Sequence, residues 1–317
     1  MPHCALRPKN GANCPSDNSA IGTIATGKRY VGRFAPSPTG PLHLGSLFAA
    51  VVSYLDARHH GGRWLVRVED IDPPREVPGA ASSILESLDA HGLCWDETPY
   101  FQRYSTERHD TAIEQLSERG ALFFCQCARK QLIAAGHQQT YPGTCRDRGL
   151  NQGAIRVRVD DTVITVQDRW QTPLSEQLDQ TPGDFIVKRR DGLIAYQLAV
   201  VVDDHAQGVT DVVRGIDLYT STPRQVWLQQ LLGIGTPRYA HFPVLLQADG
   251  DKLSKQTGAP AIDNQRTCEN LCTVFTLLGL APDAPPQDRR PEAWLSWAVS
   301  RWSQAEMLRQ TSIPPIS

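Results

Sequence analysis

The alternation of strand-like and helix-like segments near the start of the chain constrains the fold most strongly. Two short apolar segments are each followed by a longer segment whose apolar residues recur at helical spacing. This order predicts a parallel, doubly wound α/β sheet, in which ligands bind at the carboxyl ends of the strands. The expected strands are residues 29–34 and 63–69, and the expected helices are residues 43–60 and 77–91.

The alternation is interrupted over residues 101–190, which we interpret as a smaller α+β domain inserted into the sheet domain. The sheet domain then consists of residues 29–100 and 191–256. Residues 257–317 are expected to form a short helical C-terminal region, and residues 1–28 a disordered extension. The other expected elements are helices 105–118, 222–232, 266–278 and 292–302 and strands 154–159, 162–167, 184–190, 195–202, 209–214 and 242–246.

The composition is that of an ordinary globular protein of two domains, with 317 residues, 40% hydrophobic and 21% charged. A run of about 18 apolar residues would indicate a membrane span, and the sequence has none. The first 28 residues lack the apolar centre of a signal peptide. We therefore expect a cytoplasmic protein, in which the eight cysteines serve as thiols or metal ligands rather than disulfides.

The net charge of −2 gives no indication of a nucleic-acid partner. Basic residues nevertheless cluster locally, at Arg146 and Arg148, at Arg156 and Arg158, and at residues 188–190. RNA-binding proteins obtain much of their affinity from phosphate contacts of such residues. A mixed, solvated surface explains each cluster equally well, so both interpretations remain open.

Two separated segments have the features of a site that holds ATP from both sides. Residues 33–46 place His43 and Gly45 at the start of an apolar helix, where unpaired N–H groups and a partial positive charge favour phosphate. Residues 252–256 carry Lys252 and Lys255, two of only six lysines in the chain. The alternative is an isolated histidine at a helix start and a solvated lysine pair.

Both segments resemble signature motifs of the class I aminoacyl-tRNA synthetases. Residues 43–46 resemble the HIGH motif in its glutamyl version, with Ser46 in place of the second histidine. The lysine segment resembles the KMSKS loop, although Leu253 and Gln256 replace Met and Ser. Glutamine-specific relatives usually read Phe-Pro-Pro-Glu-Pro-Asn-Gly at residues 34–40, where this chain reads Phe-Ala-Pro-Ser-Pro-Thr-Gly, which favours glutamate. The resemblance extends from about Tyr30 to Ala261.

The resemblance implies a Rossmann-like catalytic domain that converts glutamate and ATP, with Mg²⁺, into glutamyl-adenylate. Negative charge spreads over the phosphate oxygens in the transition state, so the protein mainly positions the reactants and neutralises this charge. His43 and Lys255 are the implied catalytic residues. The implied ATP-binding residues are His43, Gly45, Ser46, Lys252 and Lys255.

Glutamate carries two carboxylates and one ammonium, so its site requires at least one arginine fork and one acid. The resemblance implies that Glu69 binds the ammonium, and that the pocket also contains Arg33, Phe34, Ala35, Pro36, Ser37, Tyr196 and Arg214. An ion pair of Arg214 with Asp211 or Asp217 is the alternative for that arginine. We interpret residues 203–205 (Asp-Asp-His) as a turn near the adenosine pocket rather than a metal site.

Three thiolates are available from Cys125, Cys127 and Cys145, and the first two are separated by a single residue. This pattern suits a structural tetrahedral Zn²⁺ site in a small domain. A fourth ligand is required. His137 is the usual chemical choice, whereas the resemblance points to Tyr141, and the two remain open. The fold class expected overall is a parallel α/β sheet with an inserted zinc-containing α+β domain and a short helical end.

Only 62 residues follow Lys255, too few for the long helical anticodon-binding region of ordinary glutamyl members of the family. The resemblance therefore points to a truncated branch, which activates glutamate without tRNA. Members of that branch transfer glutamate to the queuosine base at the wobble position of tRNA(Asp). We expect a monomer with glutamate, ATP and queuosine-containing tRNA(Asp) as partners. Ordinary glutamyl-tRNA charging, a non-catalytic RNA-binding paralogue and a small-molecule adenylate-forming ligase remain as alternatives.

Overall fold

The computed structural model describes residues 29–247, 250, 253, 259–280, 286–302 and 306–314. The expected disordered extension at residues 1–28 lies outside the described residues, as do Lys252 and Lys255. Within the described part, no helix combines the length and apolar character that a membrane span requires.

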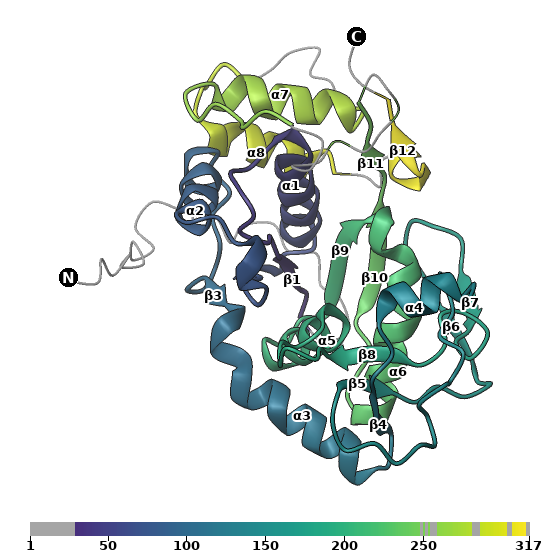
Figure 1. Cartoon of the computed structure of the whole chain (residues 1–317). Helices are drawn as coiled ribbons and strands as arrows, with labels where there is room; N and C mark the ends of the chain where they lie inside the picture. The colour runs from purple at the N-terminus through teal and green to yellow at the C-terminus, as the bar shows by residue number, and fades with distance from the viewer. Residues whose placement is uncertain are drawn as a thin grey trace, which may run out of the picture.

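A parallel sheet forms the centre of the molecule (Figure 1). Its first three strands, in the spatial order β1-β2-β3, are β1 (Val31–Phe34), β2 (Arg63–Val68) and β3 (Tyr100–Phe101), and a parallel pair follows with β9 (Asp211–Gly215) and β10 (Arg238–Phe242). Two hydrogen bonds join β1 to the start of β9: the Thr210 N–H donates to the Val31 carbonyl at 2.9 Å, and the Val31 N–H donates to Thr210 Oγ1 at 2.8 Å. The strand order β3-β2-β1-β9-β10 confirms the predicted parallel α/β sheet.

Helices cover both faces of this sheet, because its strands alternate their apolar residues between two cores. Val213 and Ala240 face one core, which α1 (Leu44–His59) fills together with α2 (Ala80–Ala90), α7 (Thr267–Leu277) and α8 (Pro291–Ser300). Val212 and Tyr239 face the other, which contains α5 (Tyr196–Ala206) and α6 (Thr222–Leu232). In Figure 1, α7 and α8 lie across the end of α1.

The prediction of a strand at residues 195–202 is wrong, since this segment begins helix α5. Seven consecutive residues from Leu198 to Asp204 are buried, including the β-branched run Val200, Val201 and Val202. A helix buried on all sides has the same continuous apolar pattern as a buried strand, so periodicity does not separate the two. The residues 203–205 lie in the same helix, so the predicted turn is wrong as well.

The predicted insertion contains a small antiparallel sheet, β4-β5-β8, and a hairpin, β6-β7. Side chains from β5, β6 and β8 pack in the same core as α5 and α6, so the insertion rests on the sheet domain. The predicted strands 154–159, 162–167 and 184–190 are confirmed, whereas β3, β4, β7 and α4 were not predicted. The elements are α3 (Thr106–Glu118), β4 (Leu122–Cys125), α4 (Arg129–Ala134), β5 (Ala154–Val157), β6 (Val163–Val166), β7 (Leu174–Gln177) and β8 (Phe185–Lys188).

Strand β10 is followed by a short strand that pairs with the end of the described chain. The predicted strand 242–246 covers the last residue of β10 and all of β11 (Val244–Leu245), which pairs in parallel with β12 (Ser312–Ile313). Pro243 separates β10 from β11 and has no N–H to contribute to a ladder. Short 3₁₀ segments occupy Pro73–Arg75, Gln102–Ser105, Ile216–Ser221 and Glu306–Arg309.

Candidate active site and metal cluster

Two loops meet at the carboxyl edge of the sheet. The loop after β1 accepts hydrogen bonds from the segment after β2, with the Glu69 N–H on the Pro36 carbonyl and the Val77 N–H on the Pro38 carbonyl, both at 2.9 Å. Parallel strands end at the same edge, so side chains from both loops can face one ligand. These contacts bring the loop after β1 next to the acidic segment after β2.

A buried group of charges lies beneath these loops. The Asp204 carboxylate accepts hydrogen bonds from Arg33 Nε at 3.0 Å and from Arg67 Nη1 at 2.7 Å. Arg67 also donates to Glu69 Oε1 at 3.3 Å. Burial opposes ionisation of Asp204, but the Arg33 and Arg67 cations hold the pKa of this carboxyl below its usual value. Two arginines and two carboxylates therefore form one alternating network.

Glu69 follows β2 directly, and its side chain is 10% exposed. Burial raises the pKa of Glu69, and the Arg67 and Arg33 cations oppose this rise. A carboxylate in these surroundings gains from a cationic ligand group, since the ligand offsets the cost of holding the charge away from water. Glu69 is thus suited to accept hydrogen bonds from an ammonium group.

Arg214 ends in the same region from β9. Its Nη2 group donates to Thr222 Oγ1 at 2.9 Å, and its Nη1 group lies 3.5 Å from the hydroxyl of Tyr196. Asp211 instead pairs with Arg238 and Arg169, so the alternative of an Arg214–Asp211 ion pair is wrong. The arginine is buried, and its guanidinium points toward the first residue of α5.

The charges around Tyr196 show that the predicted pocket residues converge. Burial raises the pKa of the Tyr196 hydroxyl; the Arg214 and Arg33 cations lower it, while the Glu69 and Asp204 carboxylates raise it further. Arg214 Nη1 lies 3.5 Å from the Tyr196 hydroxyl, and Arg33 and Glu69 both belong to the network around Asp204 and Arg67. The structure therefore brings together Arg33 from β1, Glu69 after β2, Tyr196 from α5 and Arg214 from β9.

The remaining pocket candidates occupy different positions. Phe34 is buried and stacks on Trp64, with the ring centroids 6.3 Å apart, so its side chain belongs to the core. Pro36 is buried and contributes its carbonyl to the contact with Glu69. Ala35 is half-buried, and Ser37 is exposed on the loop. Side-chain contact with a ligand is therefore open to Ser37 and Ala35, whereas Phe34 is confined to backbone contact.

Sequence reasoning did not single out Arg67 or assign Asp204 to a buried ion pair. Arg67 had a recognisable signal, because it interrupts an otherwise apolar strand and its side chain is fully buried. A charged residue in such a strand requires a partner of opposite charge. Nothing in the local sequence identifies Asp204 as that partner, since 137 residues separate the two.

The neighbouring Asp203 has a structural role. Its carboxylate accepts hydrogen bonds from Gln102 Nε2 at 2.8 Å, Ser105 Oγ at 2.5 Å and His109 Nε2 at 3.2 Å. Burial opposes ionisation, but these donors keep the pKa of Asp203 below its usual value. Asp203 thus joins α5 to α3 and the 3₁₀ turn that precedes it.

A second group of predicted site residues, those assigned to ATP, lies at the start of α1. His43 forms an antiparallel bridge with Ala261, and its N–H donates to Ser46 Oγ at 3.3 Å. A Cβ atom at Gly45 would lie 3.1 Å from His43 Cε1 and 3.3 Å from the Leu253 carbonyl oxygen. The backbone of Leu253, the one described residue of the lysine segment, therefore lies close to the helix start.

The three predicted cysteines also converge. Among the described residues, Cys125, Cys127 and Cys145 form the one group of potential metal ligands, with all three sulfur atoms within 4.8 Å of one another. The Tyr141 hydroxyl lies 3.5 Å from Cys125 Sγ and accepts a 2.8 Å hydrogen bond from the Cys145 N–H. His137 is exposed and lines one hollow with Cys127 and Cys145, whereas the Tyr141 hydroxyl directly contacts Cys125 Sγ, which favours the phenol oxygen as the fourth ligand.

The thiols differ in acidity. Burial raises the pKa of Cys127 to about 11, with a further contribution from the hydrogen bond to Cys145. Burial also disfavours the Cys145 thiolate, but hydrogen bonds from the Gln126 backbone and the neighbouring thiols lower its pKa to about 7. A cluster of converging soft donors, one of them readily ionised, fits a thiophilic metal ion.

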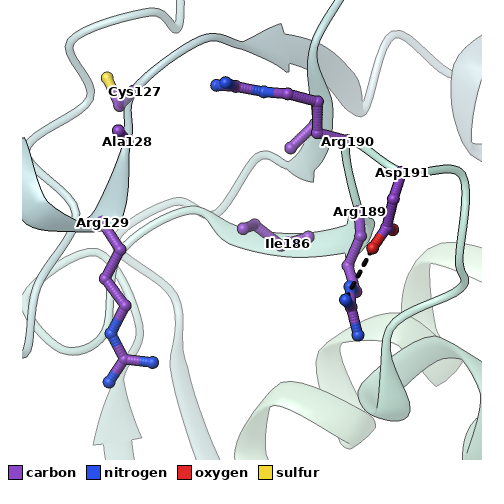
Figure 2. Close-up of a pocket in the computed structure, with 8 residues that line it drawn as sticks. Cys127, Ala128, Arg129, Ile186, Arg189, Arg190 and Asp191 are labelled. Atoms are coloured by element: carbon purple, nitrogen blue, oxygen red, sulfur yellow. Dashed lines mark hydrogen bonds and ion pairs between the residues drawn. The ribbon is translucent and has the colours of Figure 1, made fainter. Parts of the chain in front are cut away.

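An arginine-lined hollow of about 490 Å³ lies beside this cluster, in the inserted region (Figure 2). Arg190 donates to the Gln126 carbonyl at 2.8 Å, and Arg189 pairs with Asp191 at 2.7 Å. Arg189 also reaches Asp72 at 3.1 Å, three residues after Glu69, which connects the hollow to the crevice. The lining residues are Cys127, Ala128, Arg129, Ala154, Ile186, Arg189, Arg190 and Asp191.

Comparison with known proteins agrees with this geometry. The family model for the catalytic domain of class I tRNA synthetases for E and Q matches residues 30–281. The glutamyl-Q tRNA(Asp) synthetase of Pseudomonas aeruginosa is 47% identical over 287 residues, covering 90% of this chain and 97% of the relative. The protein of the same name from Thiobacillus denitrificans is 50% identical over 280 residues, covering 86% and 93%.

Solved structures show the same fold at lower identity. The glutamate-tRNA synthetase of Elizabethkingia anophelis superimposes with a TM-score of 0.75 at 24% identity, covering 92% of this chain and 68% of that one. A glutamate tRNA ligase of Elizabethkingia meningosepticum, solved with its amino acid, gives a TM-score of 0.73 at 24% identity, covering 90% and 67%. Both matches establish the fold alone.

Proposed function

This chain belongs to the class I tRNA synthetase family for glutamate and glutamine, and we propose that it transfers glutamate to the queuosine base at the wobble position of tRNA(Asp). The observation that carries the proposal is the convergence of Arg33, Glu69, Tyr196 and Arg214 at the carboxyl edge of the sheet. The choice of RNA follows from the names of the relatives, which the chain matches over nearly their whole length.

The amino-acid end of the crevice has the charges that glutamate requires. Glu69 accepts hydrogen bonds from the substrate ammonium, and Arg33 and Arg214 provide guanidinium groups for the two carboxylates. Arg33 uses Nε and Nη2 to hold Asp204, so Nη1 is the nitrogen that we assign to a substrate carboxylate. Tyr196 donates its hydroxyl hydrogen to a substrate oxygen, because burial keeps the phenol protonated.

The other end binds ATP, with Mg²⁺ as the usual companion of its phosphates. The N–H groups at the start of α1, with His43, Gly45 and Ser46, bind phosphate oxygens, and Lys252 and Lys255 of the lysine segment complete the site. A glutamate carboxylate oxygen attacks the α-phosphorus, and pyrophosphate leaves. A hydroxyl of the queuosine base then attacks the acyl carbon of the adenylate, loses its proton and releases AMP.

We infer that the RNA approaches over the arginine-lined hollow. Arg129 and Arg190 are exposed there, and Arg189 joins the hollow to Asp72 at the edge of the crevice. Arginine forks bind phosphate oxygens bidentately, and the hollow is large enough to hold part of a nucleotide. An anticodon loop held there would lie next to the adenylate.

Replacing Arg129 with alanine should raise the KM for tRNA several-fold, because one phosphate contact is lost. For a single-stranded loop, the slope of log affinity against log salt should become shallower by about 0.7. Glutamate-dependent ATP–pyrophosphate exchange should stay unchanged. Arg301→Ala, at the end of α8, is the matched control and should alter neither quantity. An unaltered salt slope in Arg129→Ala would remove the hollow from the RNA-binding surface.

The cysteine group fits a structural Zn²⁺ ion held by Cys125, Cys127, Cys145 and Tyr141, as the sequence resemblance implies. When bound, the ion would join β4 to the loop that contains Tyr141 and Cys145, where a small apolar cluster offers little core of its own. We expect it to supply folding stability rather than chemistry.

Cys125→Ala should lower the zinc content from about one ion per chain to near zero, since three ligands rarely hold a structural ion. The content is measured by elemental analysis of purified protein. Cys272→Ala on α7 is the control and should retain the metal. Tyr141→Phe and His137→Ala distinguish the two candidates for the fourth ligand. Full zinc occupancy in Cys125→Ala would take that residue off the ligand list.

The proposed function is tested by transfer of labelled glutamate to two tRNA pools, one from cells that make queuosine and one from cells that lack it. Label in the queuosine-containing pool alone is the expected result. Equal label in both pools would indicate charging of the acceptor end instead. Pyrophosphate exchange without transfer to either pool would point to a different acceptor.

A further inference from the structure

A chain of hydrogen bonds runs from the inserted region to Arg214 through the interior of the protein. Asp168 lies between β6 and β7 and forms a parallel bridge with Tyr239. Its Oδ2 atom lies 2.5 Å from His241 Nδ1, and His241 Nε2 lies 3.0 Å from Arg214 Nε. The side chains of Asp168 and His241 have no solvent exposure.

The direction of these bonds determines the tautomer of His241. An arginine Nε always carries hydrogen and only donates, so His241 Nε2 accepts and carries no proton. The single ring proton of the neutral imidazole is then on Nδ1, which donates to the Asp168 carboxylate. Burial lowers the pKa of His241, in accord with the neutral form, although the Asp168 carboxylate opposes this effect.

Hydrogen bonds hold two of the three nitrogens of the Arg214 guanidinium, and the third nitrogen lies beside the pocket residue Tyr196. Nε is held by His241, Nη2 by Thr222 Oγ1, and Nη1 lies beside the Tyr196 hydroxyl. In the described part of the chain these partners are neutral groups. Arg33, by contrast, donates directly to the Asp204 carboxylate, which neutralises part of its charge.

A carboxylate in direct contact with Arg214 would compete with a substrate carboxylate for the guanidinium. Placing the imidazole between Asp168 and Arg214 orients the arginine while leaving its positive charge available to the ligand. We propose that Asp168 and His241 are positioning residues that orient Arg214 for a carboxylate of the glutamate substrate. This inference rests on the proposed function and adds two residues that act through Arg214.

The segment that carries Asp168 is anchored on both sides. Arg169 forms a bidentate ion pair with Asp56 of α1, at 2.6 and 3.0 Å. Gln171 donates to the His241 carbonyl at 2.8 Å and to the Leu308 carbonyl at 2.9 Å. Asp168 Oδ1 also accepts from the backbone N–H groups of Trp170, Gln171 and His241, at 2.9, 3.0 and 3.2 Å. Asparagine keeps an acceptor oxygen for these bonds, so Asp168→Asn leaves the segment in place.

Asp168→Asn tests the proposal. The asparagine amide can donate to Nδ1, which favours the tautomer with a proton on Nε2, facing the Arg214 Nε–H. We expect the KM for glutamate in ATP–pyrophosphate exchange to rise about 10- to 100-fold, the usual effect of losing an outer hydrogen-bond partner. The KM for ATP should stay within about twofold of wild type. Gln171→Ala removes one anchor of the same segment but keeps the Asp168 carboxylate and its bond to His241, so it should not raise the KM for glutamate selectively.

His241→Gln and His241→Leu form a second pair, since glutamine offers an acceptor to Arg214 Nε and leucine offers none. We expect His241→Gln to retain much more glutamate affinity than His241→Leu. ¹⁵N NMR of the wild-type histidines should find His241 protonated at Nδ1. Protonation at Nε2, or an unchanged KM for glutamate in Asp168→Asn, would overturn the proposal. Equal rises in both KM values would indicate general loosening and overturn it as well.

The experiment separates this inference from the proposed function. If wild-type protein lacks glutamate-dependent exchange, the proposed function fails before any variant is compared. If wild type exchanges and Asp168→Asn behaves identically, only the positioning role fails.

Discussion

Replacing Arg214 with alanine should lower kcat/KM for glutamate in ATP–pyrophosphate exchange by about two to three orders of magnitude. Loss of one partner of a buried charge pair typically costs about 2–5 kcal/mol, and each 1.4 kcal/mol corresponds to about tenfold. The fall in kcat/KM should be larger than in Asp168→Asn. Arg214→Ala removes the guanidinium, whereas Asp168→Asn only disturbs its orientation. Arg214→Lys should recover only part of it, since an ammonium group lacks the planar fork.

Arg238→Ala is the matched control for this prediction. Arg238 lies on the neighbouring strand β10, its side chain is 60% exposed, and it pairs with Asp211 rather than with pocket residues. We expect its kinetic constants to stay within about twofold of wild type, because its ion pair is with Asp211 outside the pocket and Asp211 keeps Arg169 as a partner. Wild-type kinetics in Arg214→Ala would exclude this arginine from the glutamate site.

Replacing Asp204 with alanine should lower the free energy of unfolding by about 3–5 kcal/mol, the usual cost of removing one partner from a buried ion pair. The change leaves Arg33 buried without its counter-charge and leaves Arg67 with Glu69 as its remaining acidic partner. Both arginine side chains are nearly inaccessible to water, so neither can exchange the lost carboxylate for solvent. Urea denaturation of both proteins measures the difference.

Asp147→Ala provides the contrast. Asp147 pairs with Arg158 at 3.1 Å, but its side chain is 86% exposed. Its removal should change the free energy of unfolding by less than about 1 kcal/mol. Similar unfolding midpoints for Asp204→Ala and Asp147→Ala would contradict the importance assigned to the buried network.

Acid should remove the contribution of Asp204. Its folded-state pKa is lowered by Arg33 and Arg67, against the effect of burial, so its stabilisation is fully present above the pKa of the unfolded chain. The contribution is lost as the pH falls through the lower, folded-state pKa. The stability difference between wild type and Asp204→Asn should therefore shrink on acidification.

Several features of the site could be predicted because they are carried by local sequence. Arg33, Glu69 and Arg214 each occur at or just after the end of an apolar segment, and parallel strands bring such ends to one edge. The cysteines of the candidate metal site were identified by their number and spacing. The helix at residues 222–232 was predicted with its observed limits, because a proline begins it and a glycine ends it.

Other features depend on the side chains that surround a segment. The run of valines in α5 has the composition of a strand, and its helical form follows from packing between the sheet and the insertion. The roles of Asp168 and His241 had no sequence signal, since 73 residues separate the two. A buried polar group needs a partner, but local sequence does not identify a partner so far along the chain.

The sequence by itself determined the alternation of strands and helices at the start of the chain, the two motifs that the proposed function assigns to ATP, and the chemical types of the site residues. These follow from periodicity, turn residues and charge, which act over a few residues. Only the tertiary structure decided which charges neutralise one another: Asp204 holds Arg33 and Arg67, whereas neutral groups hold Arg214. Whether an arginine is held by a carboxylate or by neutral groups depends on distances within the interior. The strength of a buried charge interaction is set by the separation of the charges and by their surroundings.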